Sequence, residues 1–193
     1  MAGKAATPTM GGLLICSSIL VTILLLADLR NTYVHLAIVV MVWLACVGGF
    51  DDWLKLTASR RNPGSREGLL AWEKLLFQLG IGAIAGYFVY RHGIDGHGGV
   101  SAAHAFTLPF QRTYLPKSAP LQLGDGVIVL GMLGFVLISM LLIAGTSNAV
   151  NLTDGMDGLA GGTVCIASFA MMALSFIAGR IEVATFLSFP HVR

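Results

Sequence analysis

The chain has 193 residues, of which 55% are hydrophobic and 11% charged, and its formal net charge at pH 7 is +2. Soluble domains usually carry about 25% charged residues, so this composition excludes an ordinary soluble domain and indicates an integral membrane protein. The small and dispersed positive charge also argues against nucleic acid as a partner.

Five apolar segments each approach the roughly 20 residues that a helix needs to cross a bilayer. They cover residues 10–27, 33–50, 69–90, 126–146 and 159–178. Only helices and closed barrels satisfy the backbone within hydrocarbon, so all five are predicted to be transmembrane helices. The predicted fold is therefore an all-α polytopic membrane protein, with residues 1–193 in a single membrane domain.

A first polar cluster precedes the first predicted helix. Lys4 is followed by the sequence TPTMGG at residues 7–12. Pro8 can begin a helix and Thr7 can cap it, and the free N–H groups beside Lys4 would form an anion site. Taken alone, this pattern fits an ordinary entry loop equally well.

A second polar cluster, GGFDDWLK at residues 48–55, follows the second predicted helix. Adjacent helical residues point about 100° apart, so Asp51 and Asp52 serve one site only if the helix ends or bends there. Two neighbouring carboxylates suit magnesium that bridges to substrate phosphates, because this ion prefers oxygen ligands. The alternative is a solvated helix end with Lys55 as a local counter-ion.

Basic residues concentrate between the second and third predicted helices, at Lys55, Arg60, Arg61, Arg66 and Lys74. The positive-inside rule assigns this connection to the cytoplasm. Alternation then puts residues 1–12 and 148–160 on the same side and residues 92–124 outside. That external segment is compatible with a short hairpin or surface helix. Its histidines match no zinc spacing and are predicted to be solvated: His92, His97 and His104.

The richest polar stretch is NAVNLTDGMDGLA at residues 148–160. Carboxylates at a membrane edge cost free energy unless they meet water, a cation or a ligand, so they are functional candidates. In a helix, Asp154 and Asp157 would share a face and address one metal ion or polyphosphate. Gly155 and Gly158 would let backbone approach that ligand, and a helix beginning near Gly158 would point N–H groups at it. The alternative is that Asp154 only caps that helix.

Together these motifs resemble the phospho-N-acetylmuramoyl-pentapeptide transferase family of the polyprenyl-phosphate N-acetylhexosamine-1-phosphate transferase superfamily. The motifs are TPTMGG at residues 7–12, GFDD at residues 49–52 and NAVNLTDGMDGLA at residues 148–160. The resemblance extends over nearly the whole chain in motif order and span spacing.

The resemblance implies a bacterial inner-membrane enzyme with its active site on the cytoplasmic face. It would transfer phospho-N-acetylmuramoyl-pentapeptide from a UDP-linked donor to undecaprenyl phosphate, releasing UMP and forming the first lipid intermediate of peptidoglycan. Magnesium is the implied cofactor, and a homodimer is one candidate assembly. The implied biology is cell-wall biogenesis, and with it cell shape and cell division.

The same resemblance assigns roles to individual residues. The implied catalytic carboxylates, of which the first two would also hold magnesium, are Asp51, Asp52, Asp154 and Asp157. The implied substrate-binding residues are Lys4, Thr9, Lys55, Lys74, Asn151, Gly155 and Met156.

Members of this family have about ten transmembrane helices and, after these motifs, a further essential Asp and a His-rich loop. Residues 1–193 begin almost at the first motif and stop before those features, so we expect an internal fragment, incomplete at both ends and inactive alone. Two other functions stay open. A sister transferase using UDP-N-acetylglucosamine would share the Asp pair, although TPTMGG argues against it. A non-enzymatic membrane protein is the second.

Overall fold

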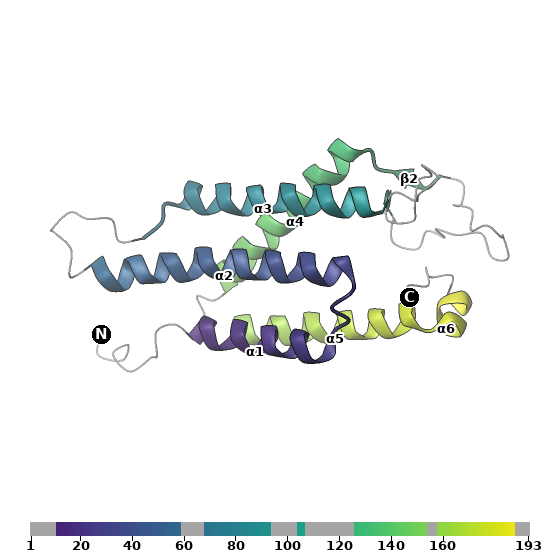
Figure 1. The fold of residues 1–193 in the computed structure, drawn as a ribbon, viewed down its shortest axis with the longest axis horizontal. Coiled ribbons are helices and arrows are strands. Elements are labelled where there is room, and N and C mark those ends of the chain that lie inside the picture. Colours follow the sequence, from purple (N-terminus) through teal and green to yellow (C-terminus); the bar gives the residue numbers. More distant parts are fainter. Residues whose placement is uncertain (1–10, 59–67, 94–103, 107–125, 154–157, 188–193) are drawn as a thin grey trace. The chain divides into compact units, whose positions relative to one another are not determined.

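The computed structural model describes residues 11–58, 68–93, 104–106, 126–153 and 158–187. Figure 1 shows that these residues are almost entirely helical, which confirms the all-α prediction. The helices are α1 (Gly11–Leu26), α2 (Thr32–Ala58), α3 (Ala71–His92), α4 (Met132–Thr153), α5 (Leu159–Gly179) and α6 (Ile181–Phe186). Two short strands, β1 (Ala105–Phe106) and β2 (Ile128–Val129), form an antiparallel pair.

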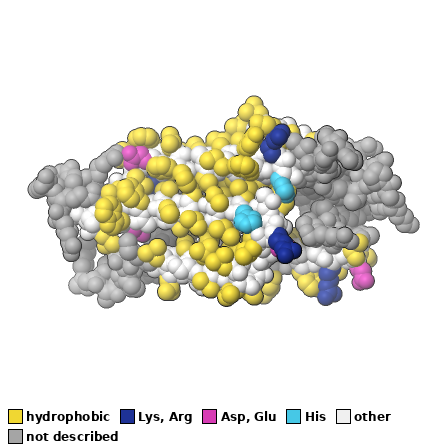
Figure 2. All heavy atoms as spheres, in the orientation of Figure 1, with side chains coloured by type: hydrophobic (Ala, Val, Ile, Leu, Met, Phe, Trp, Pro, Cys, Tyr) yellow, Lys and Arg dark blue, Asp and Glu magenta, His cyan; other side chains and the backbone are white. Residues whose placement is uncertain are grey.

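The described helices expose apolar side chains instead of enclosing a core. Three of them are long and apolar enough to cross a membrane, over Thr32–Thr57, Met132–Thr153 and Leu159–Gly179, and α1 is a shorter apolar helix. Neither α1 nor α5 contains a buried residue. Hydrophobic side chains cover the face drawn in Figure 2. Such a surface is stable in lipid and not in water, so the chain is a membrane protein.

By its contacts the chain divides into two compact units, Met1–Ala85 and Gly86–Arg193. In the first unit, α1 packs against α2 after a short connection. Asn31 caps α2, because its Oδ1 accepts a hydrogen bond from the Tyr33 N–H at 2.8 Å. Residues near the start of α1 and the end of α2 therefore lie at the same end of this unit, where they line a shared pocket.

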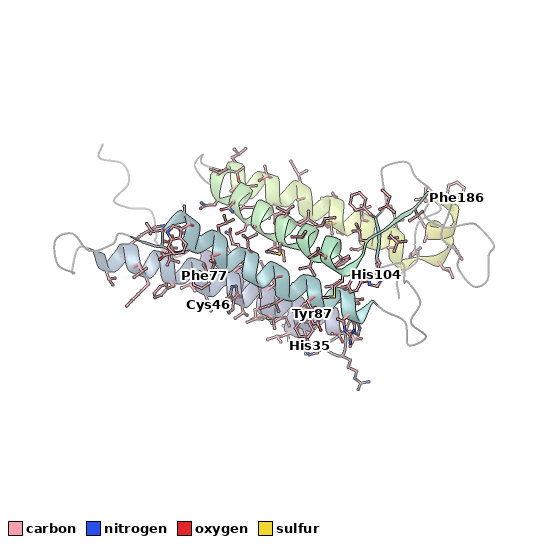
Figure 3. The ribbon with its side chains drawn as sticks, turned by 90° about the horizontal axis from the view of Figure 1, so that it is seen from above. His35, Cys46, Phe77, Tyr87, His104 and Phe186 are labelled. Atoms are coloured by element: carbon pink, nitrogen blue, oxygen red, sulfur yellow. The ribbon has the colours of Figure 1, made fainter. Side chains whose placement is uncertain are left out.

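Helix α3 contacts α2 within the first unit through aromatic side chains. The Trp43 indole Nε1 donates a hydrogen bond to the Phe77 carbonyl oxygen at 3.2 Å, and the two rings meet edge to face with centroids 6.3 Å apart. Figure 3 labels Phe77 on α3. Ile81, also on α3, is buried to 2% exposure. The polar segments at residues 51–55 and 68–74 therefore lie beside each other.

In the second unit, Gly86 of α3 packs closely against α4. A β-carbon at Gly86 would lie 2.7 Å from the Ser139 Cβ and 3.2 Å from the Val136 Cα, so only glycine allows this approach of α3 and α4. Further along the chain α4 contacts α5, and α5 contacts α6. Ala144 is buried on α4, to 4% exposure.

His104 corrects the expectation of solvated histidines. It is 2% exposed, and its Nε2–H donates to the Tyr90 carbonyl oxygen at 2.9 Å. Its ring lies 4.2 Å from that of Tyr90 and 6.0 Å from that of Phe135, and Figure 3 labels it. The expectation failed because His104 is fixed by the β1–β2 pairing, in which the Leu130 N–H donates to the His104 carbonyl oxygen at 2.9 Å. His92 is exposed, and His97 lies outside the described residues.

Candidate functional site

The acidic pair lies inside a continuous helix. A single site for Asp51 and Asp52 would require α2 to end or bend there, but the helix runs unbroken to Ala58. Glycine is common in transmembrane helices, and here it does not end the helix. Because adjacent helical residues point about 100° apart, Asp51 and Asp52 face different surroundings.

Asp51 turns toward α3 and is almost fully enclosed, with 5% exposure. Its Oδ2 contacts the Lys55 Nζ at 2.7 Å and the Lys74 Nζ at 2.6 Å. Its Oδ1 accepts a hydrogen bond from the Leu69 backbone N–H at 2.8 Å. A buried carboxylate is costly unless it is paired and hydrogen-bonded, and these three donors provide that compensation.

The backbone before α3 is shaped to reach Asp51. A β-carbon at Gly68 would lie 2.9 Å from the Asp51 Oδ1, so glycine makes room for the carboxylate. The helix then begins with half of a capping box, in which the Glu73 Oε2 accepts from the Leu70 N–H at 2.9 Å. Sequence reasoning missed Gly68 and Glu73 as parts of the site. The pattern of a glycine followed by a first-turn glutamate was the available signal.

Lys55 and Lys74 form a cationic pair around this carboxylate. The Lys55 side chain is 53% exposed and that of Lys74 is 29% exposed, so both remain within reach of an incoming anion. Lys55 lies one helical turn after Asp51, the orientation of acid before base that a helix favours. Lys55 is thus a local counter-ion of Asp51, as the alternative interpretation had it, together with Lys74, which lies 23 residues after Asp51 in sequence.

Asp52 points into a different environment. Its side chain is 52% exposed, and its closest recorded charged contact is the Lys55 Nζ, 3.6 Å from Oδ1. It lines a pocket of about 380 Å³ between α1 and α2. The other lining residues are small or apolar: Gly12, Leu13, Cys16, Met41, Leu44, Ala45, Gly48 and Gly49. An accessible carboxylate therefore meets an apolar pocket.

The third polar cluster begins on α4 in the second unit. Asn148 and Asn151 are three residues apart within the last turns of α4, and the Asn148 Nδ2 donates to the Ala144 carbonyl oxygen at 2.9 Å. Asn151 is exposed. Helix α5 begins after Gly158, which has φ 81° and gives no side-chain cap. Gly158 therefore occupies the N-cap position of α5, and Asp154, the alternative cap, lies outside the described residues.

The other predicted site residues lie outside the described part of the chain. They are Lys4, Thr9, Asp154, Gly155, Met156 and Asp157. The structure brings together Asp51, Lys55 and Lys74, with Asp52 beside them. Convergence of the first and third clusters with this group stays a prediction.

The donor atoms can be tested for a magnesium site. Among the described residues no group of three or more His, Cys, Asp or Glu side chains gathers to hold a metal ion. Magnesium often binds through only one or two carboxylates plus substrate phosphates and water, so one accessible carboxylate is sufficient on the protein side. Asp52 fits this role, whereas both oxygens of Asp51 already have partners.

Two family models match the chain. The protein-family model described as glycosyl transferase family 4 matches residues 33–191. The model described as phospho-N-acetylmuramoyl-pentapeptide-transferase signature 1 matches residues 4–16, which include Lys4 and Thr9.

Three curated relatives bear the name phospho-N-acetylmuramoyl-pentapeptide-transferase. That of Desulfotalea psychrophila is 35% identical over 190 residues, covering 98% of this chain and 46% of the relative. The Salinibacter ruber protein is 35% identical over 192 residues, which cover 99% of this chain and 47% of the relative. The Oleidesulfovibrio alaskensis protein is 36% identical over 189 residues, which cover 98% of this chain and 46% of the relative. The chain thus spans about half the length of the curated relatives it matches.

Proposed function

The chain belongs to glycosyl transferase family 4, and from this membership we propose that the complete gene product transfers phospho-N-acetylmuramoyl-pentapeptide from a UDP-linked donor to undecaprenyl phosphate. The observation that carries the proposal is the match of residues 4–16 to the phospho-N-acetylmuramoyl-pentapeptide-transferase signature, supported by three relatives of that name. The signature also favours the muramoyl donor over UDP-N-acetylglucosamine.

In this reaction an oxygen of the lipid phosphate forms a bond to the sugar-linked phosphorus, while the bond from that phosphorus to UMP breaks. The Asp52 carboxylate, whose side chain is 52% exposed, would accept a proton from the attacking phosphate. Lys55 and Lys74 supply cations for the pyrophosphate of the donor.

The remaining predicted residues complete the site in this proposal. Asp154 and Asp157 would join Asp52 as catalytic carboxylates. The nucleotide and sugar would be held by Lys4, Thr9, Asn151, Gly155 and Met156. A magnesium ion bound at Asp52 would neutralise charge on the pyrophosphate and on the leaving UMP.

We place the site at the cytoplasmic face of a bacterial inner membrane. The basic residues between α2 and α3 support this orientation, because positive residues concentrate in cytoplasmic connections. The apolar pocket beside Asp52 suits an acceptor whose phosphate is carried on hydrocarbon. A homodimer is the assembly to test first.

The test is magnesium-dependent UMP release by the complete gene product in detergent. Undecaprenyl phosphate is offered with either UDP-N-acetylmuramoyl-pentapeptide or UDP-N-acetylglucosamine, and EDTA serves as the metal-removal control. Release with the muramoyl donor alone is the expected result. Release with only the glucosamine donor would assign the protein to the sister group, and release with neither would favour a non-enzymatic role.

A further inference from the structure

The two adjacent carboxylates have separate tasks. We propose that Asp51 is a positioning residue that holds Lys55 and Lys74 as a preorganised anion-binding pair, and that of the two adjacent carboxylates only Asp52 contacts substrate and metal. This division rests on the proposed transfer reaction for its kinetic consequences. It departs from the expectation that Asp51 and Asp52 share one magnesium site.

The contacts of Asp51 leave it little capacity for substrate. Two ammonium groups and one backbone N–H lie within 2.8 Å of its oxygens, and the residue is 5% exposed. A carboxylate accepts at about four lone-pair positions, and three are already used. A magnesium ion or a phosphate proton at Asp51 would first have to displace a lysine.

The same contacts give the lysines a defined geometry. Both Nζ atoms approach a single oxygen, Oδ2, although they come from different helices, and their like charges would otherwise separate them. Lysine side chains are flexible, and fixing them before an anion arrives removes an entropic cost from binding. The cluster of Asp51, Lys55 and Lys74 carries a net charge of +1, since one carboxylate opposes two ammonium groups. Its exposed part is the lysines.

The backbone supports this reading independently of the charges. Gly68 leaves room for the Asp51 Oδ1 and the Leu69 N–H donates to it, whereas the Asp52 side chain is 52% exposed. Asp52 instead lines the pocket between α1 and α2. Asp51 is thus enclosed by its hydrogen-bond partners, whereas the Asp52 side chain is accessible.

The primary test measures lysine protection without substrate. The complete gene product in detergent is treated with a limiting amount of acetic anhydride, and acetylation of Lys74 is followed by mass spectrometry. Asp51→Asn should raise the labelling rate of Lys74 several-fold, because the ammonium loses its buried partner. Asp52→Asn is the matched control and should leave the Lys74 rate unchanged. Equal Lys74 labelling in Asp51→Asn and the parent would overturn the proposal, whatever the activity.

Kinetics supply the second readout. Asp51→Asn should raise the KM for the UDP-linked donor on the order of tenfold with a smaller change in kcat, and Asp52→Asn should chiefly lower kcat. Asp51→Glu, which keeps the charge, should recover part of both the KM and the lysine protection. A loss confined to kcat in Asp51→Asn would mark Asp51 as a catalytic residue and overturn the proposal.

A double-variant cycle gives a third readout. Lys74→Gln leaves Asp51 with Lys55 and the Leu69 N–H. If Asp51 acts through the lysines, adding Asp51→Asn to Lys74→Gln should raise KM less than it does in the parent. Fully additive effects would count against the proposal. Absence of UMP release from the parent would instead count against the proposed function, and the labelling result would stand.

Discussion

Gly68 lies so close to Asp51 that a β-carbon on the glycine would be 2.9 Å from the carboxylate Oδ1. The contact joins the chain entering α3 to the polar end of α2. It also brings the Leu69 N–H to the same oxygen, at 2.8 Å. The fit of a backbone segment around one carboxylate is the basis of the first prediction.

Gly68→Ala should displace Asp51 from its seat and destabilise the protein by about 1–3 kcal/mol, the range for overpacking a fitted site. The measurement is thermal unfolding in detergent, followed by tryptophan fluorescence. Gly49→Ala on α2 is the control, because a β-carbon there meets no atom within 4 Å. Equal unfolding temperatures for the two variants would contradict the tight fit.

Glu73→Ala should weaken the start of α3. The variant removes the Glu73 Oε2 that accepts from the Leu70 N–H at 2.9 Å. Loss of a helix cap costs about 0.5–2 kcal/mol, so a lowered unfolding temperature is expected. Glu73→Gln keeps an acceptor at the same position and should retain most of the stability. If both variants unfold at the same temperature as the parent protein, the cap does not contribute to stability.

Gly86→Ala and Gly80→Ala should have opposite effects although both lie on α3. Alanine is favoured over glycine in a helix by about 1 kcal/mol, and Gly80 has open space around it, so Gly80→Ala should be neutral or stabilising. At Gly86 the new β-carbon would lie 2.7 Å from the Ser139 Cβ, so that variant should be destabilised.

Ser139→Gly provides the corresponding rescue, since it removes the Cβ and Oγ that the new methyl group would strike. The unfolding temperature of the Gly86→Ala/Ser139→Gly double variant should lie nearer to that of the parent protein than the unfolding temperature of Gly86→Ala does. Failure of the rescue would place the clash elsewhere, for instance at the Val136 Cα, 3.2 Å from the same position.

Asp52→Asn should abolish most turnover while leaving the fold intact. Its recorded ion pair is long, at 3.6 Å, and half-exposed, so stability should change by no more than about 1 kcal/mol. Loss of a general base or metal ligand typically lowers kcat about 10²- to 10⁴-fold. UMP release and thermal unfolding measured on the same preparation test both parts, and near-parental turnover would remove Asp52 from the mechanism.

Local sequence predicted where the long helices lie, because long apolar runs favour helices in a membrane. Of the five expected spans, three correspond to described helices long and apolar enough to cross a bilayer. It placed the start of the fourth helix at residue 126, whereas Ile128 and Val129 form β2 and α4 begins at Met132. That strand pairs with residues 105–106, and such a distant partner is invisible to a local pattern.

The acidic pair shows the same limit. The sequence identified Asp51 and Asp52 as site candidates but treated them as one unit at a helix end. Their separation depends on an unbroken α2 and on Lys74 and Leu69, which lie 23 and 18 residues beyond Asp51. Long-range ion pairs of this kind arise from packing between helices, which residue spacing within one segment does not encode.

The length of α2 sets the depth at which chemistry can occur. Its 27 residues extend about 40 Å at 1.5 Å per residue, while the hydrocarbon of a bilayer is about 30 Å thick. With its apolar stretch centred in the lipid, the last turns from Asp51 onward project into the layer of phosphate headgroups. In the proposed reaction, a nucleotide from water and a phosphate tethered to the bilayer would meet at this level, and neither would have to cross the hydrocarbon interior.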